Sequence, residues 1–216
     1  MFKKIALIPV LSLCCMVSAF EVSTDFPGGN IEVLEKSDNG AKVAQQIRDT
    51  SEWWFYWNFE VSGAAGKTLE FKFSNGDPIG SFGPAASYDG GKTWEWLGAG
   101  CVKRGKDTSS FKVSIPQNAQ SARFAFCIPY MPADFDALAK EIPSLKKHPL
   151  CKTRKGRENY YYTLGNPDGK LKIFLTSRHH ACESTGTYVM EGILRELAKN
   201  GSGESSLLKD AEVIAV

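Results

Sequence analysis

The sequence has no excess of charge of either sign once its first residues are set aside. It holds 26 lysines and arginines against 24 aspartates and glutamates, and Lys3 and Lys4 account for the difference. The sequence therefore lacks the excess of positive charge that would indicate binding to nucleic acid or to an anionic membrane surface. The biases of disordered and coiled-coil chains are also missing, because 43% of the residues are hydrophobic and 23% are charged. We expect one large or two modest globular domains and no nucleic-acid partner.

The cysteines lack the spacing of a zinc ribbon. Of the six, four lie beyond residue 20, at Cys101, Cys127, Cys151 and Cys182. Their separations match no Cys-x-x-Cys pattern. Cys101 and Cys127 both fall in the strand-rich half and could pair in an oxidising compartment. Free buried thiols fit the sequence equally well.

Residues 1–19 predict a cleavable signal peptide. Two lysines precede an apolar run over residues 5–17, and Val-Ser-Ala closes the segment before Phe20. The run is too short to predict a spanning helix with a stop-transfer signal. We therefore expect export, periplasmic or secreted, with cleavage between Ala19 and Phe20 and no membrane attachment afterwards. An uncleaved anchor is the alternative.

Residues 20–130 lack helical periodicity and predict an antiparallel β-sandwich. Residues 69–73, 111–115 and 122–128 alternate apolar with polar or charged side chains, as half-buried strands do. Residues 52–61 read EWWFYWNFEV, a run with strong strand propensity. Short strands separated by glycine-rich turns are typical of a sandwich.

Two features of this half allow a structural and a binding interpretation. Residues 87–94 read SYDGGKTW, which resembles the Asp-box hairpin of sialidases and related secreted β-proteins. Asp89 can accept turn amide hydrogen bonds, and the glycines allow positive φ. We interpret it as a folding device, with a sugar-binding module as the alternative. The aromatic run 53–57 suggests a carbohydrate platform, but a strand faces both ways, so we expect at least half of it in the core.

A new pattern begins after residues 129–132, Pro-Tyr-Met-Pro, which mark a boundary. Residues 134–141 predict a short helix. Residues 144–158 are polar and basic, and we expect a solvated loop, with a rim for an anionic substrate as the alternative. Residues 160–164 and 171–177 predict two strands.

The residues between these two strands, 165–169, read GNPDG and carry strong turn chemistry, so we expect a hairpin. Because 171–175 is nearly all apolar, it predicts a central strand covered on both faces.

A strand, a polar turn and an amphipathic helix follow one another over residues 171–190. Apolar residues recur at helical spacing from Val189 to Leu197, and Ser184 or Thr185 can cap the start. Residues 212–216 then begin another apolar strand. This order predicts a βαβ unit whose polar turn lies at the carboxyl end of a parallel strand, where open α/β sheets place their sites.

His180 and Glu183 lie three residues apart in this turn. An imidazole and a carboxylate on a stiff frame can bind a first-row metal, although a helix cap and its neighbour would look alike. Residues 176–192, which contain R-x-H-x-x-E between strand and helix, resemble the first zinc-binding signature of the zinc carboxypeptidases, the carboxypeptidase A superfamily. Ala181-Cys182 replaces the usual Pro-Gly between the ligands, a variant of the cytosolic-carboxypeptidase-like branch.

The resemblance implies a β-sandwich over 20–130 followed by 131–216 as the amino-terminal part of an α/β zinc-peptidase domain. It implies Zn²⁺ held by two histidines and one glutamate, of which His180 and Glu183 have matches here. It also implies a zinc-activated water that hydrolyses the carboxyl-terminal residue of a peptide substrate. His179 is the nearest alternative ligand, and we expect His148 to be a surface histidine.

The resemblance places a third ligand, a substrate-binding arginine and a general-base glutamate downstream of the last strand. From this we expect an incomplete catalytic domain, inactive alone, with no catalytic residue of its own beyond the two ligands. The alternative is a non-catalytic exported binding module for a peptide or glycan, with a remnant peptidase domain.

Overall fold

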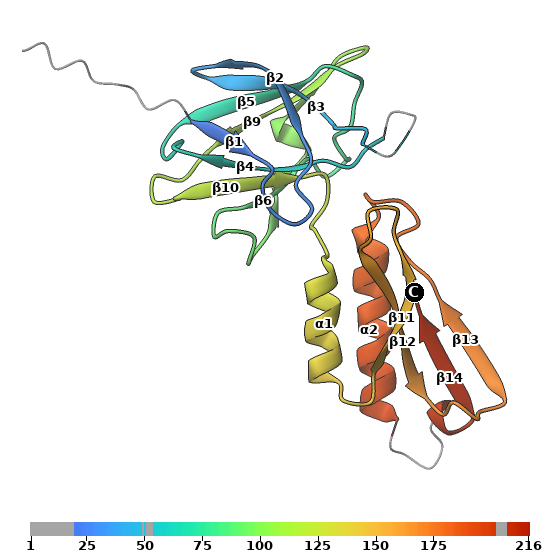
Figure 1. Cartoon of the computed structure of the whole chain (residues 1–216). Coiled ribbons are helices and arrows are strands. Elements are labelled where there is room, and N and C mark those ends of the chain that lie inside the picture. Colours follow the sequence, from blue (N-terminus) through green and yellow to red (C-terminus); the bar gives the residue numbers. More distant parts are fainter. Residues whose placement is uncertain (1–19, 49, 51–53, 202–206) are drawn as a thin grey trace, which may run out of the picture.

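The computed structural model describes residues 20–48, 50, 54–201 and 207–216. The predicted signal peptide, 1–19, and Trp53 lie outside them. Figure 1 shows a β-sandwich and a smaller α/β unit, joined by the segment that follows β10. Among the helices that the structure describes, none is both long and apolar enough to cross a membrane.

The sandwich consists of two five-stranded sheets. The first has the order β1 (Glu21–Ser23), β4 (Asn58–Ser62), β10 (Ser121–Ala125), β6 (Ala85–Ser87) and β7 (Glu95–Trp96). The second has the order β2 (Glu32–Ser37), β3 (Gly40–Ala44), β5 (Thr68–Phe73), β9 (Ser109–Ser114) and β8 (Val102–Arg104), with a 3-10 turn at Ala99–Cys101. One pair departs from the expected antiparallel pattern, because β3 and β5 run parallel.

The core between the sheets is aromatic. Phe71 on β5 and Phe124 on β10 lie with ring centroids 5.8 Å apart across the two sheets. Burying such a side chain stabilises the fold by about 1.5–3 kcal/mol. Tyr56 and Trp57 are buried, Trp54 is half-buried and Phe55 is 44% exposed, so half of the described aromatic run is core, as expected. The strand itself begins only at Asn58.

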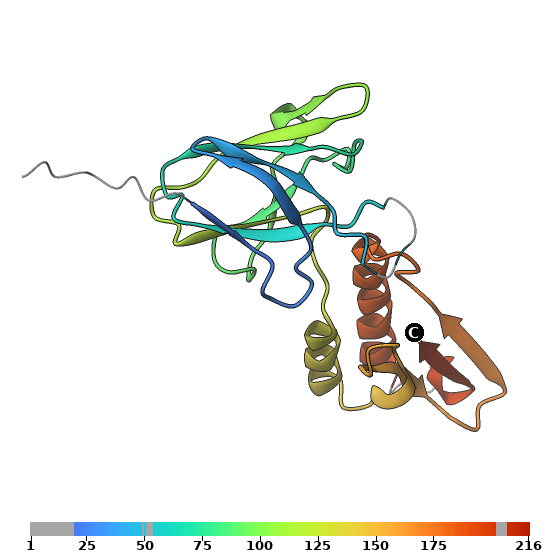
Figure 2. The same ribbon diagram turned by 45° about the horizontal axis from the view of Figure 1, so that its top comes forward.

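The second unit places two helices on one face of a four-stranded sheet (Figures 1 and 2). The sheet order is β11 (Lys146–Lys152), β12 (Glu158–Gly165), β14 (Ala211–Ala215) and β13 (Leu171–Leu175). The helices are α1 (Pro132–Glu141) and α2 (Ser184–Asn200), and a 3-10 turn spans Leu207–Lys209. β13, α2 and β14 form the predicted βαβ unit, with its two strands parallel. The predicted fold class, a β-sandwich followed by an α/β unit, is confirmed.

Three expectations for this unit were wrong. β12 and β13 do not form a hairpin, because β14 lies between them and pairs with both. β13 is the edge strand of the described sheet, and Phe174 on it is 66% exposed. The basic segment after Ser144 is largely a strand, β11, whose lysines face solvent at the opposite edge. Charged side chains suit an edge strand because they discourage pairing with other chains.

Candidate metal site at the turn between β13 and α2

The candidate site lies where the chain leaves the carboxyl end of β13. β13 ends at Leu175, whose carbonyl accepts a hydrogen bond of 2.9 Å from the amide of Val216 beside it. The chain then turns and α2 begins at Ser184. This is the edge at which parallel α/β sheets place functional groups. The predicted capping by Ser184 or Thr185 was wrong, because Glu183 is the N-cap residue and makes no side-chain capping bond.

The structure brings the two predicted ligands together. Nδ1 of His180 lies 2.8 Å from Oε1 of Glu183. The amide of His180 donates to Oε2 of the same carboxylate at 3.1 Å, and the amide of Glu183 donates to the carbonyl of His180 at 3.0 Å. The turn is therefore closed by its own backbone, and this closure sets the distance between the two side chains.

The electrostatics of the turn keep the carboxylate ionised. The hydrogen bond from the His180 side chain, followed by that from its backbone, lowers the pKa of Glu183 below its ordinary value. The two side chains are 75% and 47% exposed, so a cation and a substrate can reach them. A neutral imidazole and an ionised carboxylate are donors that zinc accepts, so both residues fit the metal that the sequence implies.

No third ligand accompanies them in the part of the chain that is described. Within it, no group of three or more histidine, cysteine, aspartate or glutamate side chains is placed to hold a metal ion. His179 is exposed and lines a groove with Glu183. His148 is half-buried on β11, where its Nε2 lies 2.9 Å from Oγ1 of Thr163 and its ring stacks on Tyr161. These contacts on the sheet account for the position of His148 without a role in metal binding.

Cys182, the cysteine between the two ligands, packs against the end of the sandwich domain. All four described cysteines carry free thiols. Burial raises the pKa of the Cys182 thiol, which disfavours the thiolate that a metal would need. The backbone carbonyl of Cys182 accepts a hydrogen bond of 3.0 Å from Sγ of Cys127, which lies at the end of the sandwich domain.

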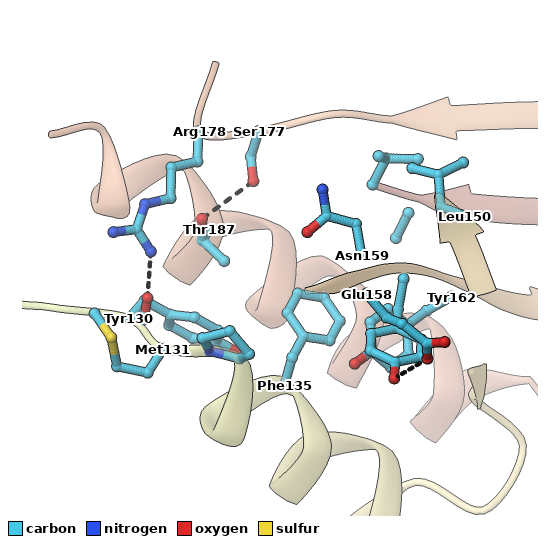
Figure 3. Close-up of a pocket in the computed structure, with 14 residues that line it drawn as sticks. Tyr130, Met131, Phe135, Leu150, Glu158, Asn159, Tyr162, Ser177, Arg178 and Thr187 are labelled. Carbon is cyan, nitrogen blue, oxygen red and sulfur yellow. Dashed lines mark hydrogen bonds between the residues drawn. The ribbon is translucent and has the colours of Figure 1, made fainter. Parts of the chain in front are cut away.

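Sequence reasoning missed the role of Arg178. The first residue of R-x-H-x-x-E has a left-handed backbone, with φ 55°. Its Nε and second terminal nitrogen donate to the carbonyl of Ala181, at 3.2 and 3.1 Å, and its other terminal nitrogen donates to the carbonyl of Tyr130. Figure 3 shows Arg178 reaching from the turn to Tyr130. The spacing of the motif marks Arg178, but only the fold shows which groups it contacts.

A pocket of about 320 Å³ adjoins the turn (Figure 3). Arg178 lines one end of it and Glu158 the other, and Phe135 and Tyr162 stack in its wall at a centroid distance of 4.4 Å. The pocket thus combines an apolar wall with a cationic and an anionic end. A volume of this size lies at the lower end of the range of small-molecule sites.

The Asp-box segment is built as the sequence predicts. Asp89 accepts hydrogen bonds from the amide and hydroxyl of Thr93, at 3.0 and 2.7 Å, and from the hydroxyl of Ser87 at 2.8 Å. Gly90 and Gly91 take positive φ. Every bond of the carboxylate closes its own turn, which agrees with a folding device.

Comparison with known proteins finds similarity to cytosolic carboxypeptidases and to a bacterial protein that matches most of the chain. Residues 22–126 match the family described as the cytosolic carboxypeptidase N-terminal domain. An uncharacterized protein of Zymomonas mobilis is 24% identical over 193 residues, which are 88% of this chain and 50% of that one. Human cytosolic carboxypeptidase 2 is 26% identical over 121 residues, which are 50% of this chain and 13% of that protein.

The solved structures agree on the fold of both units. A metallo-carboxypeptidase from Pseudomonas aeruginosa, in complex with (2-guanidinoethylmercapto)succinic acid, superposes with a TM-score of 0.74 at 22% identity. The match covers 91% of this chain and 54% of that one. The chain spans about half the length of the Zymomonas relative and of this structure. These similarities support a relationship to the zinc carboxypeptidase-like family, and residues 22–126 resemble the amino-terminal domain of its cytosolic branch.

Proposed function

We propose that this chain carries the first two zinc ligands, His180 and Glu183, of an exported metallocarboxypeptidase that removes carboxyl-terminal residues from peptides. One observation carries the proposal. An imidazole nitrogen and a carboxylate oxygen converge to 2.8 Å at the carboxyl end of a parallel strand, in a turn open to solvent. The family relationship supports the choice of metal and of reaction.

Each residue of the turn has a defined task in this proposal. A zinc ion, when bound, supplies Lewis-acid activation of a water molecule and of the scissile carbonyl. His180 would offer the lone pair of a neutral imidazole nitrogen, Nδ1 or Nε2 according to its tautomer. Glu183 offers an oxygen that its lowered pKa keeps ionised at neutral pH. The backbone bonds of the turn hold both donors in place before the metal arrives.

Peptide hydrolysis asks for more than these two ligands. It needs a third ligand, a general base and a cation for the terminal carboxylate of the substrate. We propose that these groups belong to the portion of a carboxypeptidase that the matched relatives have in addition. His180 and Glu183 alone are then expected to bind zinc weakly and to give negligible turnover.

Metal binding tests this proposal directly. Zinc titration by calorimetry should give one weak site in the wild-type protein, and His180→Ala and Glu183→Ala should each abolish it. His148→Ala is the matched control, because it removes a histidine that is engaged elsewhere, and should leave the titration unchanged. Equal binding by wild type and His180→Ala would remove His180 from the ligands, and His179→Ala would then identify the nearest alternative.

Export is a separate part of the proposal. The lysines, apolar run and small-residue site of residues 1–19 support it. Expression with and without this segment, followed by cell fractionation and intact mass, tests it. Export would be contradicted if the protein stays in the cytoplasmic fraction and its mass shows that residues 1–19 are still attached.

One observation favours a second candidate, a non-catalytic binding module. Phe82 and Trp96 lie on the sandwich with ring centroids 5.9 Å apart, and they are 69% and 41% exposed. Exposed aromatic pairs provide rigid contact area for sugars and peptides. If glycan or peptide arrays give binding that Trp96→Ala removes while His180→Ala does not, the binding module is the better assignment.

A further inference from the structure

Four consecutive residues at the end of the sandwich domain bind the segment that carries the metal turn. Cys127 donates from Sγ to the Cys182 carbonyl at 3.0 Å. The next three act through their carbonyls: Ile128 accepts from the Ser184 hydroxyl at 2.5 Å, Pro129 from the Tyr188 hydroxyl at 2.8 Å, and Tyr130 from the Arg178 guanidinium. All four partners lie within residues 178–188. The metal turn is thus built against the sandwich domain as well as on β13 and α2.

Arg178 is the residue of this junction that reaches into the turn itself. Only Arg48 and Arg178, among the non-glycine residues described, have positive φ, at 53° and 55°. This conformation costs about 1 kcal/mol or more, so it persists only where other contacts enforce it. In Arg178 the enforcing contacts are the carbonyl of Ala181, directly after His180, and the carbonyl of Tyr130. One planar guanidinium therefore joins the metal turn to the domain junction.

We propose that Arg178 is a positioning residue that sets the geometry of His180 and Glu183 from the sandwich domain. This inference rests on the proposed zinc site. The guanidinium presents its donors in a fixed plane, so two carbonyls on different segments are held at a fixed separation. The sandwich domain is then part of the metal site, because its last residues determine the shape of the turn that presents the ligands.

The left-handed backbone allows a clean substitution. Asparagine tolerates this conformation, so Arg178→Asn removes the guanidinium without adding backbone strain. Arg178→Lys keeps the charge but loses the fork. Arg48→Asn is the matched control, since Arg48 has the same backbone conformation and its guanidinium donates to the carbonyl of Gly29 within the sandwich.

Two readouts separate positioning from folding. Removing a partner that orients a metal ligand typically costs about 10–100-fold in metal affinity, so Arg178→Asn should weaken zinc binding by about that factor. Amide hydrogen exchange at residues 180–183 should accelerate, while that of β5 and β9 stays slow. Arg178→Lys should fall between wild type and Arg178→Asn in both measurements, and Arg48→Asn should match the wild type in both.

Unchanged zinc affinity and unchanged exchange in Arg178→Asn would overturn the inference and leave the proposed function standing. If the wild type binds no zinc, the proposed function fails, and the exchange of the turn still decides whether Arg178 positions it. If Arg178→Asn also loses protection in β5, Ser184→Ala replaces it, because this change removes only a hydroxyl that contacts the same junction, at the carbonyl of Ile128 and Sγ of Cys127. A smaller change in the same direction then supports the inference, and no change overturns it.

Discussion

The hydroxyl of Tyr130 donates a hydrogen bond of 2.7 Å to the carboxylate of Glu191, which joins the domain junction to the middle of α2. The ring of Tyr130 is only 3% exposed and packs edge-on against Phe135 and Tyr188. Burial first, and then the bond to Glu191, raises the pKa of Tyr130, so its hydroxyl stays a donor at neutral pH. The same carboxylate also accepts from Nε of Arg195 at 2.8 Å.

Removing this hydroxyl should weaken the junction. Tyr130→Phe is expected to lower the free energy of unfolding by about 1–2 kcal/mol, because a partly buried bond to a charged acceptor is lost while Glu191 keeps Arg195. Urea unfolding followed by circular dichroism measures it. Tyr160→Phe is the control, since its hydroxyl makes a solvent-exposed hydrogen bond to Glu158 and its loss should leave the midpoint unchanged. Equal effects of the two changes would contradict the view that the Tyr130 hydroxyl stabilises the domain junction.

The Asp-box carboxylate should give the sandwich a recognisable pH dependence. The backbone and hydroxyl of Thr93, and then Ser87, hold the pKa of Asp89 far below its ordinary value. Protonation therefore favours the unfolded chain. The stabilising contribution is complete above the unfolded pKa of about 3.9 and is lost as the pH falls from there towards the folded value.

Asp89→Asn tests this dependence. The difference in free energy of unfolding between wild type and variant should be constant above about pH 5 and should shrink below about pH 4, because the unfolded wild-type chain then binds a proton at Asp89 that Asn cannot bind. Urea unfolding at several pH values measures it. Asp38→Asn, in the turn between β2 and β3, is the control. A difference that stays constant down to pH 2 would show that Asp89 does not hold the turn as a carboxylate.

The thiols should differ widely in reactivity in the reduced, folded protein. Cys151 is exposed on β11, whereas Cys127 is buried and bonded to the Cys182 carbonyl. Burial raises the pKa of Cys101 and of Cys182, which lowers their thiolate fraction. In protein expressed without residues 1–19, a chromogenic disulfide reagent should therefore titrate one of the four described thiols fast, and Cys151→Ser should remove that phase. A fast phase that survives Cys151→Ser would assign the reactivity to another cysteine.

Apart from the parallel pairing of β13 with β14, the features that sequence reasoning predicted are local ones. The alternation of Leu69, Phe71 and Phe73 with charged residues describes one face of β5, and all three are fully buried. The Asp-box closes within its own eight residues, and the spacing of His180 and Glu183 is fixed by one turn. In each case the partners are close in the sequence, so the pattern contains the contact.

The hairpin error concerns partners far apart in the chain. The turn after Gly165 does reverse the chain, with the Asp168 amide donating to the Asn166 side chain at 2.9 Å. Turn chemistry cannot show that β14 enters between the two strands. That placement follows from burial of Val213 and its apolar neighbours on β14 at the centre of the sheet. The bond from Cys127 to the Cys182 carbonyl likewise joins groups that leave no pattern in the sequence.

Two neighbouring residues of α2 offer a test of how this helix lies on the sheet. Leu194 is fully buried in the core that α1, α2 and the sheet share, whereas Ile193 is 41% exposed beside β13. Truncation to alanine deletes the same number of carbons from each. Leu194→Ala should lower the free energy of unfolding by about 2–5 kcal/mol, and Ile193→Ala by less than about 1 kcal/mol. Urea unfolding followed by circular dichroism measures both losses. Equal losses would mean that α2 is rotated from the orientation described.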